Sequence, residues 1–386
     1  MRSVELFSGC GGLALGLARA GFKHDLLVEL NGDAFATLEL NKKRRIAHIR
    51  DWNLLNADVK GVGWSELDLV PDVVAGGPPC QPFSIGGKHR GHTDDRDMWP
   101  EAARALGELK PRAFIFENVR GLTRPAFGEY LRWIKAALER PNHGRQSGEG
   151  FEQHLSRLEK INSDPLYDVR VEIVDAADFG APQRRHRVVV VGVRRDLGVS
   201  LPDLKRTHSR DRLLWDQWVT GAYWERHGLP RPSSIPANRQ DARTVQRLAT
   251  VLLEPDGEAW VTVRDALASL GEPNGVDGHV FQDGAKVYPG HTGSPLDSPA
   301  KALKAGDHGV PGGENMMVRD DGTVRYFTIR EAARLQGLPD DWLFATSWSE
   351  SMRQLGNAVP SQLSQALGEW VGRTLGRASV QTSKAA

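Results

Sequence analysis

The sequence predicts an α/β protein whose main sheet is parallel and covered by helices on both faces. Over residues 1–195, short apolar runs typical of buried strands alternate with segments of helical pattern, and Gly, Pro or Asn residues separate them. After residue 195 this alternation stops, which indicates a second part of different construction. The length of 386 residues fits two or three domains at roughly 150 residues per domain.

The first part should contain strands and helices in alternating order. Its apolar runs are too short for helices and rich in Val, Ile, Leu and Phe, and they predict strands at residues 4–7, 26–28, 71–75, 113–116, 169–174 and 188–193. Helices are expected at residues 13–20, 34–41, 99–108 and 130–138. A further helix at 151–161 follows the polar stretch 141–150 and looks like an insertion.

The second part is predicted at residues 196–325, where Pro and Gly are scattered and no long helical or strand period occurs. Its Trp residues are expected to form a small core. From residue 326 a helical pattern resumes at 329–336, 351–355 and 361–375. Residues 326–376 should therefore return to the first domain, and residues 377–386 should form a frayed tail.

The composition excludes a largely disordered chain and a collagen-like chain. Hydrophobic residues make up 40% and charged residues 26%, as in ordinary globular proteins. Lys and Arg total 50 against 49 Asp and Glu, so an acidic partner must meet a local basic surface. No run approaches the roughly 18 apolar residues of a membrane span, so we expect a cytoplasmic protein. Cys10 and Cys80 are far apart in the sequence, which excludes a disulfide framework, but a lone Cys can be a nucleophile.

A glycine turn follows the first predicted strand. The residues Ser8, Gly9, Cys10, Gly11 and Gly12 lead directly into a helix, so backbone amides should point into a crevice at the strand end. Glu29 comes 20 residues after Gly9, where a carboxylate could accept ribose hydroxyls. A nicotinamide enzyme, an adenosylmethionine enzyme and a purely structural turn all remain open at this point.

The strand predicted at 71–75 leads into Cys80 through Gly-Gly-Pro-Pro, and Gln-Pro-Phe-Ser follows. The two prolines stiffen the turn and remove backbone donors. A free Cys is usually a buried small hydrophobic residue, but a core Cys needs no such loop. The surroundings of Cys80 therefore favour a reactive thiol at the edge of the sheet.

These motifs, with four others in the same order, resemble those of the DNA cytosine-5 methyltransferases of prokaryotic restriction–modification systems. The matching stretches are residues 5–12, 78–81, 117–119, 183–187, 330–336 and 356–360, while 95–99 is only a loose match. The resemblance implies a Rossmann-like, adenosylmethionine-dependent methyltransferase sheet over residues 1–195. It also implies a smaller target-recognition domain at 196–325.

The resemblance implies four catalytic residues. The Cys80 thiolate would add to carbon 6 of cytosine, because carbon 5 accepts a methyl group only after the ring loses its aromaticity. Glu117 would stabilise ring nitrogen 3 as an acid. Arg187 would bind the cytosine carbonyl oxygen, and Arg185 would hold Glu117 or a backbone phosphate. The sequence names no base for the carbon 5 proton.

The cofactor implied by the resemblance is S-adenosyl-L-methionine. Phe7 could stack on adenine, the loop amides could take the carboxylate, and Glu29 could take the ribose hydroxyls. Asp58 matches the family residue that meets the adenine amine, and the residues near 357 would return to this pocket if the last helix packs beside the first strand. The residues expected to bind the cofactor are Phe7, Ser8, Gly9, Cys10, Gly11, Gly12, Glu29, Asp58, Pro78, Asn357 and Val359.

Double-stranded DNA is the expected partner, and we expect a monomer that associates with the nucleoid through its DNA and holds no metal. A stacked target base must be flipped out and covered, and residues 83–96 are the predicted cover. Residues 205–247 hold nine Lys or Arg against four Asp or Glu, which indicates a DNA-facing surface.

Three other functions are compatible with parts of the sequence. An NAD-dependent oxidoreductase leaves the Cys80 loop without a purpose. A non-enzymatic DNA-binding protein is disfavoured because the catalytic side chains are present. A tRNA cytosine-5 methyltransferase shares the catalytic motifs and differs only in its recognition region, so an assay of duplex DNA against tRNA must separate the two.

Overall fold

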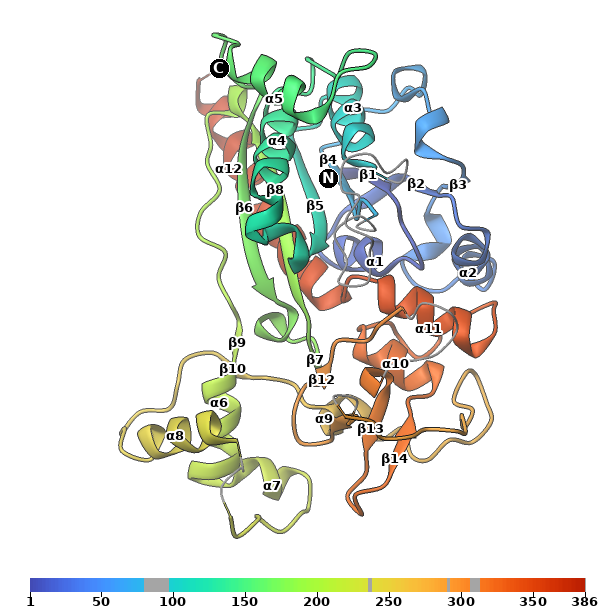
Figure 1. Ribbon diagram of the computed structural model, residues 1–386, viewed down its shortest axis with the longest axis vertical. Coiled ribbons are helices and arrows are strands. Elements are labelled where there is room, and N and C mark those ends of the chain that lie inside the picture. The colour runs from blue at the N-terminus through green and yellow to red at the C-terminus, as the bar shows by residue number, and fades with distance from the viewer. Residues whose placement is uncertain (80–96, 235–237, 290–291, 306–312, 386) are drawn as a thin grey trace.

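A seven-stranded sheet forms the centre of the larger part of the molecule, shown in Figure 1. The computed structural model describes residues 1–79, 97–234, 238–289, 292–305 and 313–385, with side chains as far as residue 378. The strand order is β3-β2-β1-β4-β5-β8-β6. The strands are β1 (Arg2–Leu6), β2 (Lys23–Glu29), β3 (Leu54–Asn56), β4 (Val73–Gly76), β5 (Ala113–Val119), β6 (Tyr167–Asp175) and β8 (His186–Arg194).

The expectation of a parallel sheet holds for five of these strands and is wrong for β8 and β6, whose pairings are antiparallel. Strands β3, β2, β1, β4 and β5 pair in parallel, whereas β8 is antiparallel to both of its neighbours, β5 and β6. Parallel neighbours need a crossover of a dozen or more residues. The connection from β6 to β8, residues 176–185, is too short for one.

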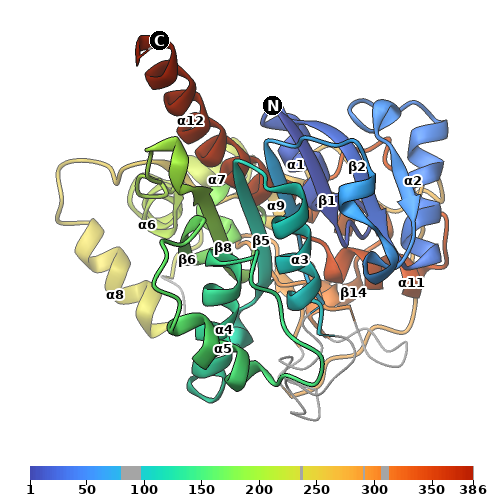
Figure 2. The same ribbon diagram turned by 90° about the horizontal axis from the view of Figure 1, so that it is seen from above.

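Helices cover both faces of the sheet, as Figure 2 shows from above. Side chains of a strand alternate between faces, so in β5 Phe114 and Phe116 pack with one set of helices, and Ala113 and Ile115 with the other. The first set is α3 (Trp99–Leu109), α4 (Gly128–Glu139) and α5 (Phe151–Glu159). The opposite set is α1 (Gly12–Arg19) and α12 (Ser361–Ala385), with α2 (Gly32–Lys43) beside α1.

Two helices near the C-terminus are longer than the sequence predicted. Helix α11 (Trp348–Asn357) starts earlier because the Ser347 side chain caps it, accepting from the Glu350 N–H. Helix α12 continues to Ala385, so the expectation of a frayed tail from residue 377 is wrong. Residues 377–385 contain no Pro or Gly that would end a helix. Helix α10 (Ile329–Leu335) agrees with the expected range.

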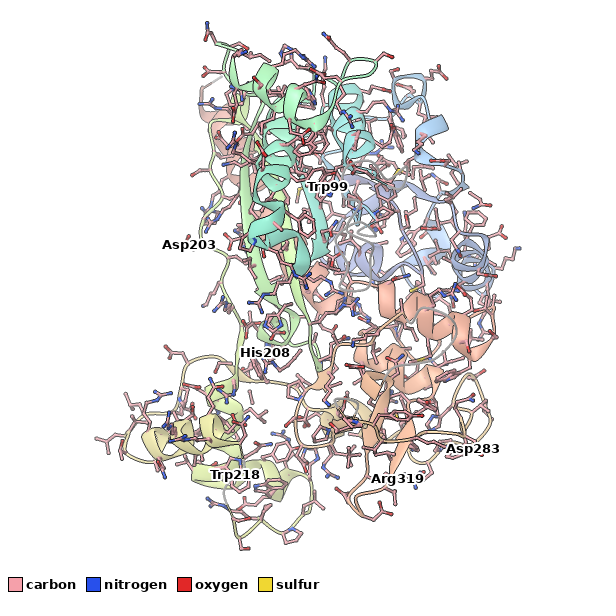
Figure 3. All side chains as sticks on the ribbon, viewed as in Figure 1. Trp99, Asp203, His208, Trp218, Asp283 and Arg319 are labelled. Carbon is pink, nitrogen blue, oxygen red and sulfur yellow. The ribbon has the colours of Figure 1, made fainter. Side chains whose placement is uncertain are left out.

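The chain leaves the sheet after β8, passes Asp203 and enters a region of short elements near His208, as Figure 3 shows. One group of these elements carries Trp218, and a second group carries Arg319. Buried Trp224 and Trp260 lie in the core of the first group, as expected. The short elements are α6 (Arg210–Leu214), α7 (Ala222–Arg226), α8 (Arg239–Leu248), α9 (Val263–Leu267), β9 (His208–Ser209), β10 (Glu258–Ala259), β11 (Ser294–Pro295), β12 (Ala300–Lys301), β13 (Met316–Val318) and β14 (Val324–Tyr326). Strand β7 (Gln183–Arg184) precedes β8 and pairs with β12.

The second group shares its core with the larger part of the molecule. Val263, Ala300 and Met317 belong to the same buried cluster as Leu15 of α1 and Leu38 of α2. Because this core is shared, it marks no boundary between the two parts. The domain limits predicted at 195/196 and 325/326 therefore stay predictions. Among the described helices, none is both long enough and apolar enough to cross a bilayer.

Candidate active site

The turn between β1 and α1 is built from backbone conformations that most residues avoid. Phe7 has a φ of 58°, which is strained for an aromatic residue, and Gly9 and Gly11 have φ values of 53° and 90°. Gly12 has no room for a side chain, because a Cβ there would lie 2.4 Å from the Val359 carbonyl oxygen. The turn can therefore approach the C-terminal segment closely, and it forms one wall of a pocket.

Glu29, at the end of β2, holds this turn in place. One carboxylate oxygen accepts from the Gly9 N–H at 2.7 Å, and the other accepts from the Asn31 N–H at 2.7 Å. Burial raises the pKa of Glu29, and these backbone hydrogen bonds partly offset that effect. The Gly9 amide is thus already engaged, although the sequence suggested that it was free for a cofactor carboxylate.

Helices α11 and α12 bring the end of the chain to the same turn. Helix α12 packs against α1, and the Cys10 Sγ lies 3.7 Å from the Gln354 carbonyl oxygen of α11. Asn357 and Val359 therefore reach the pocket from more than 300 positions away in the sequence. The expectation depended on the last helix packing beside the first strand, whereas α12 packs beside the first helix, α1.

A pocket of about 500 Å³ brings the expected site residues together. Gly11 is the exception, because it faces Leu38 and Trp342 behind the turn instead of the pocket. Cys80 lies outside the described residues, as do 83–96, but Pro79 lines the pocket and Cys80 is the next residue. The expected residues that line the pocket are Phe7, Ser8, Gly9, Cys10, Gly12, Glu29, Asp58, Pro78, Glu117, Arg185, Arg187, Asn357 and Val359.

At the ends of β5 and β8 the pocket holds a carboxylate and a guanidinium. Glu117 and Arg187 form an ion pair through Oε1 and Nε. Gly77 lies beside this carboxylate, and a Cβ there would be in ordinary van der Waals contact with Glu117 Oε2. The neighbouring Asn118 donates to the Pro78 carbonyl oxygen at 3.0 Å, which ties the end of β5 to the segment that leads to Cys80.

Arg185 is placed differently from the expectation. Its side chain is almost fully buried and donates to the carbonyl oxygens of Leu303 and Gly356. It is Arg187 that pairs with Glu117. Arg185 thereby joins the segment before residue 306 to the start of the last motif, so its contacts are those of a positioning residue.

Cys10 is unsuited to be a nucleophile. Its side chain is 1% exposed, and burial raises the pKa of its thiol to about 12. A thiolate is the reactive form, and Cys10 is neutral at physiological pH. Cys80, the other Cys residue of the sequence, stays the predicted nucleophile.

The pocket wall also contains residues that sequence reasoning missed. Leu30 follows Glu29 and is 61% exposed, so a bound ligand would cover its apolar surface. Glu350 and Arg353 lie one turn apart on α11 and join the wall beside Asn357. A helical projection from Asn357 backwards could have indicated them, because positions 350, 353 and 357 share one helix face.

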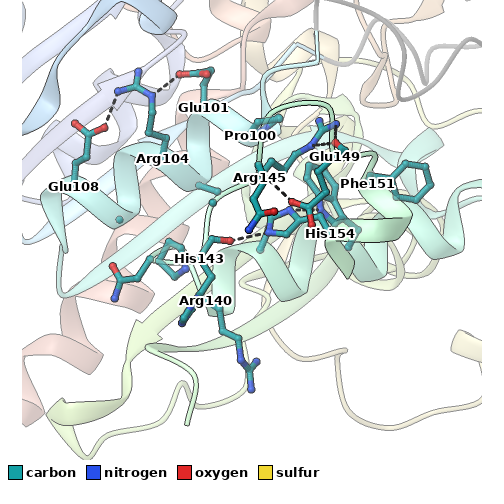
Figure 4. Close-up of a pocket in the computed structure, with 18 of the residues that line it drawn as sticks. Pro100, Glu101, Arg104, Glu108, Arg140, His143, Arg145, Glu149, Phe151 and His154 are labelled. Atoms are coloured by element: carbon teal, nitrogen blue, oxygen red, sulfur yellow. Dashed lines mark hydrogen bonds and ion pairs between the residues drawn. The ribbon is translucent and has the colours of Figure 1, made fainter. Parts of the chain in front are cut away.

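A second hollow of about 800 Å³ lies apart from this pocket, between α3, the end of α4 and the loop before α5 (Figure 4). Its wall contains none of the described residues expected at the site. Arg104 pairs with both Glu101 and Glu108, and Arg157 pairs with Glu149. The wall is thus largely neutralised by its own ion pairs.

The basic stretch 205–247 is only partly available to a partner. Arg210 and Arg247 pair with Asp241 and Asp211, which ties α6 to α8. Arg239 and Arg243 are exposed on α8, one turn apart, with no carboxylate partner among the described residues. Within the described ranges, no group of three His, Cys, Asp or Glu side chains is placed to hold a metal ion.

Comparison with known proteins extends over almost the whole chain. A family model described as C-5 cytosine-specific DNA methylase matches residues 1–373. Type II methyltransferase M.PspPI of Psychrobacter sp. (strain TA137) is 31% identical over 381 residues, which is 97% of this chain and 80% of that protein. Type II methyltransferase M.NgoMIV of Neisseria gonorrhoeae is 29% identical over 97% of both chains.

The fold is also found in a solved structure. DNMT2 of Spodoptera frugiperda matches 96% of this chain and 99% of its own, with a TM-score of 0.60 at 15% identity. At this identity the likeness concerns the fold alone. It agrees with the sheet and its flanking helices as described above.

Proposed function

Because the chain belongs to the C-5 cytosine-specific DNA methylase family, we propose that it methylates carbon 5 of a cytosine within a specific double-stranded DNA sequence. The observation that carries this proposal is one pocket that unites Glu117, Arg187 and Asn357 from three separate motifs with Glu29 at the end of β2. The Type II names of its relatives support a role as the modification enzyme of a restriction–modification system.

The pocket fits S-adenosyl-L-methionine by the chemistry of its walls. The carboxylates of Glu29 and Asp58 can accept hydrogen bonds from ribose hydroxyls and the adenine amine, and Phe7 and Leu30 offer apolar surface for the base. When bound, this cofactor supplies a methyl group on a positively charged sulfur, which a carbon nucleophile can attack. The chain's own residues must supply everything else.

The covalent step is assigned to Cys80. Its thiolate adds to cytosine carbon 6, which makes carbon 5 nucleophilic enough to take the methyl group. Water then takes the proton from carbon 5, and the electron pair of that bond forms the double bond to carbon 6 as the Cys80 thiolate leaves, which restores the aromatic ring. The buried and neutral thiol of Cys10 supports this assignment, because it removes the competing nucleophile.

Glu117 and Arg187 are assigned to the cytosine ring. When the base enters, the ion pair opens and the Glu117 carboxylate takes up a proton from water. Glu117 then donates to ring nitrogen 3 while negative charge develops there, and Arg187 binds the carbonyl oxygen beside it. Their ion pair fixes both groups at the ends of neighbouring strands before the base arrives. Asn118 acts through its bond to the Pro78 carbonyl and positions the chain that enters Cys80.

Recognition of the DNA sequence is assigned to residues 196–325, with exposed Arg239 and Arg243 as phosphate-binding groups. The target base must leave the duplex to reach Glu117, so base flipping is part of the proposal. Since the substrate is DNA, we place the enzyme in the cytoplasm at the nucleoid, where it acts as a monomer.

Bisulfite sequencing of DNA from cells that express the protein tests this function and gives the modified site. We expect protected cytosines within one short recurring sequence, and none in cells that express Cys80→Ser. Purified protein should label duplex DNA, but not tRNA, with a radioactive methyl group. Labelling of tRNA alone would contradict the proposal and support the RNA alternative.

A further inference from the structure

We propose that Arg353 and Glu350 of α11 bind the amino-acid end of the cofactor, with Arg353 on its carboxylate and Glu350 on its ammonium group. This inference rests on the proposed use of S-adenosyl-L-methionine and assigns two residues outside the motifs that carry the family resemblance. Both residues line the same pocket as Glu29 and Asn357.

The glycine turn alone offers few donors for a carboxylate. The Gly9 N–H is bonded to Glu29 at 2.7 Å, and the Gly11 N–H to the Ser8 carbonyl oxygen at 2.9 Å. Gly11 also faces away from the pocket. The amides of Cys10 and Gly12 remain, and a carboxylate that leaves water for two amides needs a further charged partner.

Three arginines line the pocket, and two of them are committed elsewhere. Arg187 pairs with Glu117, and Arg185 donates to two main-chain carbonyl oxygens. Arg353 is 47% exposed, and its one ion pair among the described residues is with Glu350, at 3.4 Å. Arg353 is therefore the guanidinium that can turn toward a ligand.

Most acidic residues of the pocket wall are likewise already bound to other groups of the protein. Glu29 accepts from two backbone N–H groups, Asp58 accepts from the Lys60 N–H, and Glu117 pairs with Arg187. Glu350 is 18% exposed, and its side chain makes only the pair with Arg353 within the described part of the chain. It is the carboxylate left for an ammonium group.

The position of Glu350 and Arg353 on α11 places this pair at the end of the pocket beside the glycine turn. Glu350, Arg353 and Asn357 share the face of α11 opposite to its buried residues, and all three line the pocket. The same helix touches the turn through Gln354, whose carbonyl oxygen lies 3.7 Å from Cys10 Sγ. The ion pair thus stands beside the turn, where the amino-acid end is expected.

Charge complementarity completes the argument. The amino-acid end of the cofactor is a zwitterion, with one negative and one positive group a few ångströms apart. A side-chain pair of opposite charges on one helix face presents the matching pattern. On binding, Glu350 and Arg353 can exchange their mutual contact for two contacts with the ligand at little cost, because the pair is partly open to solvent and such ion pairs contribute little to stability.

Isothermal calorimetry with two ligands tests this inference. S-adenosylhomocysteine carries the adenosine and the amino-acid end, whereas 5′-methylthioadenosine lacks the amino-acid end. We expect Arg353→Gln and Glu350→Gln to weaken S-adenosylhomocysteine binding by at least about tenfold, with 5′-methylthioadenosine unchanged. Arg353→Lys should recover part of the loss. Arg373→Gln is the matched control, because Arg373 pairs with Glu369 on α12 at 3.5 Å, and it should change neither affinity.

The outcomes separate this inference from the function on which it rests. If the wild-type protein binds neither ligand, the proposed function fails. If the wild type binds both and the variants match it, or lose both ligands equally, the assignment of the pair is wrong. A loss of DNA affinity by Arg353→Gln, with S-adenosylhomocysteine binding retained, would also overturn it and make Arg353 a phosphate contact.

Discussion

At the scale of single residues, Glu29 has two roles in the cofactor wall. It fixes the glycine turn through Gly9 and Asn31, and it is the proposed acceptor for the ribose hydroxyls. Replacing it with Ala removes charge-assisted hydrogen bonds worth about 1.5–3 kcal/mol, so we expect S-adenosylhomocysteine affinity to fall roughly ten- to hundredfold. Turnover at saturating cofactor should fall less.

Calorimetry on Glu29→Ala and Glu29→Gln checks this expectation. The amide of Gln keeps one acceptor for the backbone, so this variant should lie between Ala and the wild type. Unchanged affinity in the Ala variant would mean that the pocket beside Glu29 does not hold the ribose.

Motif spacing predicted which residues gather at the site, but it did not predict their bonds. Glu29 and Glu117 could be placed from the sequence because each lies at or near the end of a strand that ends at the same edge of the sheet. Arg187 lies at the start of β8 and reaches this edge because β8 runs antiparallel to β5, which the sequence did not predict. Which arginine pairs with Glu117 depends on the packing of Leu303 and Gly356 around Arg185, and these residues are distant in sequence. Glu350 and Arg353 belong to a helix whose orientation only the fold determines.

At the scale of elements, His24 joins two strands and a helix. Its Nδ1 accepts from the Ser3 hydroxyl of β1, and its Nε2–H donates to the Ala14 carbonyl oxygen of α1. Burial lowers the pKa of His24 to about 4, so the folded protein keeps it neutral. The unfolded chain takes up a proton below about pH 6.5, and the folded protein does not.

The free energy of unfolding should therefore decrease as the pH falls from about 6.5 to 4, by up to about 3 kcal/mol from this residue. Above pH 6.5 the residue adds no pH dependence. Urea unfolding at pH 7.5 and pH 5 measures the difference. In His24→Gln the decrease should be smaller, and a decrease equal to that of the wild type would show that other groups cause it.

Helix α1 meets α12 at a glycine. A Cβ at Gly16 would lie 2.3 Å from the Ser364 side chain and 2.4 Å from the Ser361 carbonyl oxygen. We expect Gly16→Ala to destabilise the protein by about 1–3 kcal/mol, because overpacking moves the helices apart. Since this contact also brings Asn357 to the pocket, cofactor affinity should fall as well.

Gly376 of α12 is the matched control, because nothing lies within 4 Å of its Cβ position. Gly376→Ala should leave stability unchanged or raise it by roughly 0.5–1 kcal/mol through helix propensity. Thermal unfolding of both variants distinguishes the cases. Equal effects of the two substitutions would contradict the packing of α12 on α1.

The sequence predicted most elements where one local signal dominates. The Val-rich run of β8 and the apolar run of β5 were placed correctly. Strand β3 has three residues, too few for a period, and it exists because β2 offers it an edge. The direction of β8 follows from the length of its connection to β6, which a local pattern does not report.

At the scale of the whole molecule, recognition and chemistry should be separable by point changes. Arg239 and Arg243 are exposed on α8, away from the cofactor wall. Replacing both with Ala should weaken DNA binding and reduce the slope of log K against log salt by about 2, since each phosphate contact contributes about 1. S-adenosylhomocysteine affinity should not change.

Titration of labelled duplex at several salt concentrations measures this slope, with Arg373→Ala as the control on a distant helix. A slope identical to that of the wild type would show that Arg239 and Arg243 of α8 do not contact the DNA phosphates. Point changes are preferable to deletion of residues 196–325, because Val263, Ala300 and Met317 share a core with α1 and α2. This shared core joins segments that are distant in sequence, so it could not be predicted from a local pattern.

The proposed function requires that Cys80 bonds covalently to a cytosine whose carbon 5 receives the methyl group. The most direct test uses duplex DNA that carries 5-fluorocytosine at the modified site, together with S-adenosyl-L-methionine. Fluorine cannot leave carbon 5 as a proton does, so the bond between sulfur and carbon 6 should persist. Mass spectrometry of the digested complex should find the methylated base on the peptide that contains Cys80. Absence of any denaturation-resistant complex, while ordinary DNA is methylated, would contradict the account, as would an adduct on Cys10.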